Sequence, residues 1–180
     1  MNHHPDEDIK IYEGAREEPA FSGAGEAAAA EYVAHRENGN LAKTHQLGEL
    51  LAETLVGDAR RLRQESCCRQ KLVLLSYLAK DELRRGLHSP ILQRSAVSAM
   101  ERRLEDVSPE IYDVVTDSTA FTLYILNGRQ GDGRSTGEIL AQICDRDGDP
   151  PLVARGNQLE AEYRKLFGGI IASYTLREIP

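Results

Sequence analysis

Helix start signals recur along the second half of this sequence, and they constrain its fold more than any other feature. In each signal a serine or aspartate side chain can accept a hydrogen bond from a free amide of the first helical turn. Three of the four also place proline where a helix needs no N–H, and the fourth is a capping box. They are Ser89-Pro90, Ser108-Pro109, Ser135-Thr136-Gly137-Glu138 and Asp149-Pro150. Apolar residues between them recur at three- and four-residue steps, so the sequence predicts an all-α domain.

Three apolar patterns indicate how the helices are arranged. Residues 47–62 carry an apolar stripe on one face, whereas Leu72–Ala79 is apolar on nearly every side, which is typical of a central helix. The last stripe has the spacing of a bundle seam, and its residues are Leu152, Gly156, Leu159, Tyr163, Leu166, Ile170 and Tyr174. A one-sided stripe is buried against another helix. We therefore predict a single bundle of six to seven helices, with Leu72–Ala79 and the Leu152–Tyr174 seam at its centre.

The segment from Ile111 to Leu126 is compatible with two structures. Threonine and valine are frequent in it, and β-branched residues lower helix propensity, so a strand over Phe121–Ile125 is an alternative. We predict one helix over residues 111–126, because a lone strand would have no partner elsewhere. A shorter, alanine-rich helix is predicted over residues 27–36, ending at Asn38-Gly39-Asn40.

The first 24 residues differ in composition from the rest of the chain. They are rich in aspartate and glutamate, and Ile9, Ile11, Tyr12 and Phe21 are their main apolar residues. So little apolar surface does not offset a backbone entropy cost of about 1–2 kcal/mol per ordered residue. We expect residues 1–24 to be a flexible acidic N-terminal segment that can be removed without unfolding the domain, and residues 25–180 to form the helical bundle domain.

Length, hydropathy and cysteine content indicate the broad class of protein. A chain of 180 residues is typically one domain, and none of its apolar runs approaches the roughly 18 residues of a membrane helix. The N-terminus lacks the basic and apolar pattern of a secretory signal. Three cysteines, two of them adjacent, do not make a disulfide framework. We expect a cytoplasmic protein with reduced thiols, the alternative being a redox pair among Cys67, Cys68 and Cys144.

Charge is unevenly distributed along the chain. The net charge of −7 argues against nucleic acid as the main partner. Residues 1–37 carry a net −6, residues 38–107 a net +3 and residues 108–180 a net −4. Arginine suits carboxylates and phosphates, so the basic middle predicts a surface for an acidic partner or an anion, with pairing to nearby acids of the same chain as the alternative. The candidate residues are Arg60, Arg61, Arg63, Arg69, Arg84 and Arg85.

Motifs for phosphate, metal and covalent chemistry are incomplete. The glycine-rich stretch 128–137 lacks the Gly-Lys-Ser/Thr ending of a phosphate loop. Asp145, Asp147 and Asp149 resemble the start of a calcium loop, but the sixth position is Pro150 and the twelfth is Gly156. The chain also lacks the Glu-x-x-His pairs of di-metal bundles and an evident catalytic triad. We therefore nominate no catalytic residue, metal ligand or cofactor.

Three hypotheses for function remain open. The first is a non-enzymatic helical interaction module whose protein partner has an acidic surface. The second is a small-molecule-binding or enzymatic bundle with a polar site on residues 111–126, where Tyr112, Asp117, Thr119 and Tyr124 are the candidate groups. The third is a nucleic-acid-linked regulator that uses the arginine-rich segment 60–103. The first fits best the separated charges and the missing catalytic motifs.

Overall fold

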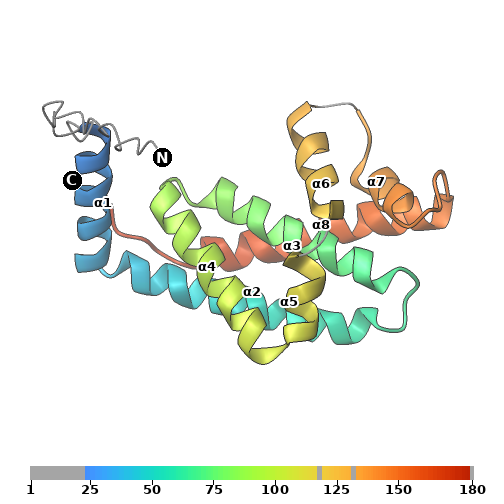
Figure 1. Cartoon of the computed structure of the whole chain (residues 1–180), viewed down its shortest axis with the longest axis horizontal. Coiled ribbons are helices and arrows are strands. Elements are labelled where there is room, and N and C mark those ends of the chain that lie inside the picture. The colour runs from blue at the N-terminus through green and yellow to red at the C-terminus, as the bar shows by residue number, and fades with distance from the viewer. Residues whose placement is uncertain (1–22, 117–118, 131–132, 179–180) are drawn as a thin grey trace, which may run out of the picture.

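The computed structural model describes residues 23–116, 119–130 and 133–178 of the chain, and within these ranges it contains eight helices and no strand. The predicted all-α fold is confirmed (Figure 1). The helices are α1 Gly23–Glu37, α2 Asn40–Leu62, α3 Cys68–Gly86, α4 Pro90–Val107, α5 Pro109–Thr116, α6 Thr119–Gln130, α7 Thr136–Ile143 and α8 Pro150–Ala172. The acidic segment predicted to be flexible lies almost wholly outside the described residues.

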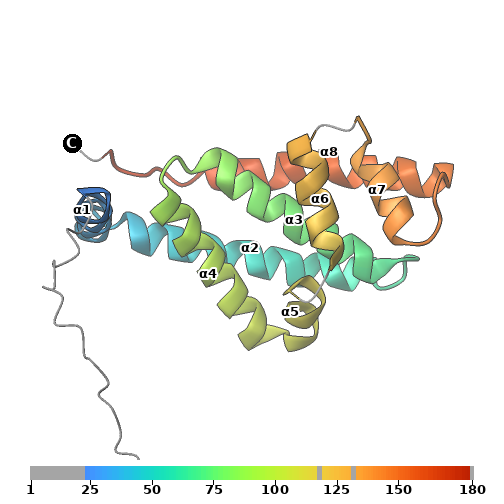
Figure 2. The same ribbon diagram turned by 45° about the horizontal axis from the view of Figure 1, so that its top comes forward.

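Helix α3 is the central element of the bundle. Every residue from Lys71 to Ala79 is buried, as the sequence predicts, and α3 packs on α2 and on each of the helices α4 to α8. Figures 1 and 2 show α2, α3 and α8 running along the long axis of the molecule, with α1 turned across one end and α6 and α7 at the other. No helix of the described residues is long and apolar enough to cross a membrane.

The predicted helix starts are confirmed by their hydrogen bonds. Ser89 Oγ accepts a bond from the Ile91 amide at 3.2 Å, and Asp149 Oδ1 accepts one from the Leu152 amide at 3.2 Å. Ser135 and Glu138 form a complete capping box, with each side chain bonded to the other residue's amide. Helix α5 begins at Pro109, directly after the serine predicted to start it. Local capping thus fixes where these helices begin.

The prediction of a single helix over residues 111–126 is wrong, and so is the alternative of a strand. Two helices, α5 and α6, occupy this segment, which raises the count from the predicted six to seven helices to eight. Thr116 Oγ1 bonds back to the Tyr112 carbonyl at 2.7 Å, one example of a hydroxyl competing for backbone groups at the end of a helix. Helix α5 packs on α3 and α4, whereas α6 packs on α3 and α7. The two halves therefore share α3 as a neighbour and differ in the second helix that each contacts.

The predicted seam of α8 is correct over its first half and shifts in the second. Leu152, Gly156, Leu159 and Tyr163 are buried as expected, but the buried face continues through Phe167 and Ile171 rather than Leu166 and Ile170. The Leu166 side chain is 42 % exposed. Because four residues turn a helix by about 400°, each of these four-residue steps moves the buried face about 40° around α8. Helix α8 runs unbroken through Gly168 and Gly169.

Candidate functional site

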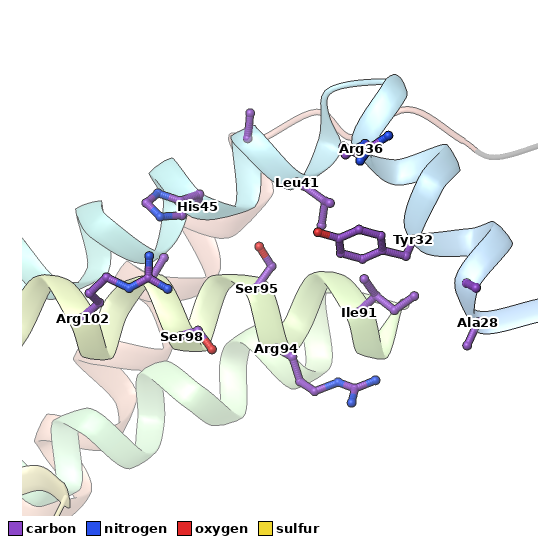
Figure 3. Close-up of a pocket in the computed structure, with 13 residues that line it drawn as sticks. Ala28, Tyr32, Arg36, Leu41, His45, Ile91, Arg94, Ser95, Ser98 and Arg102 are labelled. Carbon is purple, nitrogen blue, oxygen red and sulfur yellow. The ribbon is translucent and has the colours of Figure 1, made fainter. Parts of the chain in front are cut away.

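The candidate site is a groove of about 820 Å³ between α1, α2 and α4 (Figure 3). We call it the α1–α4 groove. Its apolar lining comes from all three helices and consists of Ala28, Ala29, Tyr32, Leu41, Ala42, Ile91 and Ala99. In Figure 3 the Tyr32 ring of α1 faces Leu41 of α2 and Ile91 of α4. Tyr32 is 48 % exposed, so a large aromatic surface remains open to a ligand.

Close packing of α2 on α4 forms the base of the groove. A Cβ atom added to Gly48 would lie 2.9 Å from Ala99 Cβ and from the Met100 amide nitrogen, and would meet the Ala96 carbonyl oxygen. The two helices therefore touch backbone to backbone at this point, since only glycine leaves room for such an approach. Ala99 belongs both to this contact and to the groove lining.

Helix α1 diverges from this pair at a left-handed glycine. Gly39 has φ 81°, a conformation that L side chains rarely adopt, and it separates α1 from α2. Most of α1 from Gly25 to Ala30 is exposed. The turn thus directs α1 away from the α2–α4 pair and leaves one face of α1 open. The helix ends directly before residues 38–40, where the sequence predicts its end.

Two sets of polar contacts hold α1 as the side of the groove. Ser89 Oγ donates to Glu31 Oε1 at 2.5 Å, which joins α1 to the start of α4. Asn40 Oδ1 accepts from the Arg177 amide at 2.9 Å and its Nδ2 donates to the Arg177 carbonyl at 2.8 Å. The same Nδ2 lies 3.1 Å from Nδ1 of His35 in α1. We call the bonds between Asn40 and Arg177 the C-terminal clamp.

Three arginines line the groove without a carboxylate partner. Arg36, Arg94 and Arg102 make no ion pair within 4 Å among the described residues, and Arg94 Nε donates only to the Pro90 carbonyl at 3.3 Å. The next residue of α4 behaves differently, since Arg103 pairs with Glu53 at 2.9 Å. The site therefore combines an apolar base with uncompensated positive charge. It can bind an anionic group that is attached to an apolar one.

The arginines nominated from the sequence lie at two ends of the bundle. Arg60, Arg61, Arg63 and Arg69 lie around the α2–α3 turn, and Arg84 and Arg85 lie at the opposite end of α3. Fifteen residues separate Arg69 from Arg84, which is about 22 Å of helix. The structure therefore does not bring all six into one surface.

Several of these arginines have partners inside the chain. Arg84 and Arg85 lie 2.7 and 3.0 Å from the Asp81 carboxylate, which also bonds to Arg164. Burial opposes ionisation of Asp81, but the bonds from Arg84 and Arg164 outweigh it and lower the pKa of Asp81. At the other end Arg61 pairs with Asp58 at 3.2 Å and Arg63 with Glu110 at 3.9 Å. Arg60 and Arg69 have no ion pair among the described residues.

The polar groups nominated on residues 111–126 do not form one pocket. Thr119 lines a hollow of about 440 Å³ together with Arg69 and Asp113, whereas Tyr112 is half-buried and does not line it. Tyr124 is buried and stacks on Tyr77, with 5.3 Å between ring centroids. Burial raises the pKa of Tyr124, and its hydroxyl has no hydrogen-bond partner among the described residues. Asp117 lies outside the described residues.

The cysteines are free in the structure. The thiols of Cys67 and Cys144, which the sequence offers as a redox pair, are neighbours joined by a hydrogen bond. Burial, together with this bond, raises the pKa of the Cys144 thiol to about 12. In the part of the chain that the structure describes, no group of three or more histidine, cysteine, aspartate or glutamate residues is arranged to hold a metal ion.

Arg36, Arg94 and Arg102 were not among the residues nominated from the sequence. The spacing of α4 contains a signal for two of them, because Arg94, Ser98 and Arg102 recur every four residues and Ser95 and Ala99 lie beside them. Residues three and four positions apart lie on the same side of a helix, so this spacing indicates a helix face of small residues with arginines beside them. Arg36 gives no comparable signal, since its place in the groove depends on the turn at Gly39.

A scan of protein-family models, a search of curated proteins and a search of solved structures each found no match to this chain. The shape and charge of the α1–α4 groove are therefore the observations that bear on function.

Proposed function

We propose that this chain is a non-enzymatic interaction module that binds an acidic, amphipathic helical segment of a partner protein in the α1–α4 groove. The observation that supports this most directly is the combination of an apolar lining with three arginines that have no carboxylate partner among the described residues. The proposal keeps the acidic partner expected from the charge pattern and moves its binding surface to Arg36, Arg94 and Arg102.

The dimensions of the groove suit a short helix. Its α4 side runs over the twelve residues from Ile91 to Arg102, a rise of about 16 Å, which matches three helical turns of a ligand. A helix laid in a groove presents apolar residues at three- and four-residue steps, and Tyr32, Leu41 and Ile91 are placed to contact them. Carboxylates on the flanks of that helix would meet the arginines, whose planar guanidinium groups bind carboxylates in pairs of hydrogen bonds.

The electrostatic contribution is expected mainly in the rate of association. Arg36, Arg94 and Arg102 are exposed, and exposed charges steer a partner more than they stabilise the complex. Binding should therefore weaken as salt rises, because ions screen charges beyond about 10 Å at 0.1 M. The apolar contacts should persist at high salt and account for the remaining affinity.

The test uses a fluorescently labelled synthetic helix with leucines on one face and glutamates on its flanks, which we call the acidic probe. A second peptide carries glutamine at each glutamate. Fluorescence anisotropy with the full chain is expected to show tighter binding of the acidic probe, and weaker binding by the double variant Arg94→Gln/Arg102→Gln. Arg60→Gln is the matched control, since Arg60 is exposed, lacks an ion pair among the described residues and lies away from the groove.

Two results would contradict the proposal. One is equal affinity for the acidic probe and its glutamine analogue, which would remove the role of charge. The other is that the natural chain, the double variant and the Arg60→Gln control all bind the acidic probe with equal affinity, which would place binding outside the groove.

A further inference from the structure

We propose that the chain's own residues 1–22 occupy the α1–α4 groove and compete with the acidic partner. This inference rests on the proposed function of the groove and assigns its regulation. Residues 1–22 contain six acidic and two basic residues. Their main apolar residues are Ile9, Ile11, Tyr12 and Phe21. The segment thus carries both kinds of group that the groove is built to take, carboxylates for the arginines and apolar side chains for the base.

The point of attachment brings this segment to the groove. Helix α1 begins at Gly23, and the groove lining begins only five residues later at Ala28, about 8 Å along the helix. Adding the 16 Å of the α4 side gives a path of about 25 Å from Gly23 to Arg102. Twenty-two residues span up to about 70 Å when extended, so the segment reaches every part of the groove with chain to spare.

Its carboxylates are spaced to meet the unpartnered arginines. Glu13, Glu17 and Glu18 precede Gly23 by five to ten residues. A flexible chain of that length has a root-mean-square span of about 12–19 Å, which falls within the path from Gly23 to the arginines of α4. Two acids on the helices that form the groove already have other contacts, because Glu31 accepts from Ser89 and Glu49 lies 3.5 Å from His45. Arg94 and Arg102 remain available to the segment.

Tethering makes even weak docking effective. A short flexible linker gives an effective concentration of about 1 mM. If the detached segment bound with a dissociation constant of about 0.1 mM, it would fill the groove about nine-tenths of the time when attached. An outside partner would then bind about tenfold more weakly than to an open groove. Replacing the carboxylates of the segment with neutral amides should therefore restore the tenfold loss in affinity for the partner.

The absence of tryptophan from the natural sequence allows a direct reporter of docking. Tyr12→Trp in the full chain places the sole tryptophan in the acidic segment. At low salt we expect blue-shifted emission and weak quenching by acrylamide. High salt, or the added pair Arg94→Glu/Arg102→Glu, is expected to restore the emission and quenching of an exposed indole, while Arg60→Glu leaves them unchanged. Tryptophan emission that changes neither with salt nor with the substitutions Arg94→Glu/Arg102→Glu would overturn the inference.

A binding measurement separates this inference from the proposed function. The acidic probe is titrated into the natural chain and into the variant Glu13→Gln/Glu17→Gln/Glu18→Gln, with melting temperatures measured for both. We expect the variant to bind about tenfold more tightly. Equal affinity of the two chains overturns competition by the segment and leaves the groove's function intact. No binding by either chain overturns the proposed function itself.

Discussion

Replacing Gly48 with alanine is expected to destabilise the protein by separating α2 from α4. The new Cβ would lie 2.9 Å from Ala99 Cβ and from the Met100 nitrogen, and would also meet the Ala96 carbonyl oxygen. Carbon atoms pack at about 3.5–4.0 Å, so the helices must move apart by close to 1 Å. Two of the three atoms belong to backbone, which prevents relief by a side-chain rotation.

The magnitude follows from two opposing effects. Overpacking of this kind costs about 1–3 kcal/mol, and the rigid neighbours of Gly48 favour the upper end. Alanine in a helix interior gains about 1 kcal/mol over glycine. We therefore expect Gly48→Ala to lower the free energy of unfolding by about 2 kcal/mol, or the melting temperature by about 4–8 °C for a chain of this size.

Gly57 provides the matched control within the same helix. It is exposed, and a Cβ added there meets no atom within 4 Å. Gly57→Ala should raise the free energy of unfolding by about 0.5–1 kcal/mol through helix propensity alone. Both variants are compared by urea denaturation followed by circular dichroism. A Gly48→Ala protein that gains stability as Gly57→Ala does would refute the backbone contact between α2 and α4.

Three other perturbations test separate parts of the structure. Glu65 bonds to Arg155 and to the buried Lys71, and the Arg155 bond is the main cause that lowers the pKa of Glu65 to about 2. The stability from Glu65 is present above about pH 4.5 and lost as pH falls toward 2. Glu65→Gln should cost about 2 kcal/mol at neutral pH and remove that part of the acid dependence in melting curves, and an unchanged pH profile would contradict it. Raising the pKa of Cys144 from 9.0 to about 12 lowers its thiolate fraction at pH 8 about a thousandfold, of which the greater nucleophilicity of a high-pKa thiolate restores about twentyfold. Cys144 should therefore react with iodoacetamide about 50-fold more slowly in the folded chain than in urea, as peptide mass spectrometry would measure. Equal rates would contradict the raised pKa. Asn40→Ala should lower stability by about 2 kcal/mol, because the C-terminal clamp is lost, and should weaken binding of the acidic probe, because the contact of Asn40 with His35 of α1 is lost with it. Unchanged affinity would show that α1 is held otherwise.

Sequence reasoning succeeded where structure is decided locally. The caps at Ser89, Ser135 and Asp149 and the turn at Gly39 are properties of a few adjacent residues, and all are present as expected. The all-round apolar pattern of Leu72–Ala79 likewise identified the central helix, because such a segment is stable only when surrounded.

It failed where distant packing selects among local options. The break between α5 and α6 accompanies a division in packing, since α5 also contacts α4 whereas α6 also contacts α7. The choice of Phe167 over Leu166 depends on how α8 lies against α3 and α7. The groove depends on the direction of α1, which the contact of His35 with Asn40 helps to set, and Asn40 is itself bonded to Arg177. No pattern within a window of sequence contains that contact.

The C-terminal clamp has a consequence for how long the groove persists. It joins residues 137 positions apart and fixes Asn40, whose side chain also contacts His35 of α1. The other tie of α1, between Glu31 and Ser89, joins residues 58 apart. Among the described side chains of α1, none belongs to the buried apolar core, so few interactions oppose the detachment of this helix. Segments with few buried contacts open with a free energy well below that of global unfolding. Hydrogen exchange in α1 should accordingly be faster than in α3. Since only chains with α1 in place are competent to bind, affinity should decline on warming before the bundle itself melts.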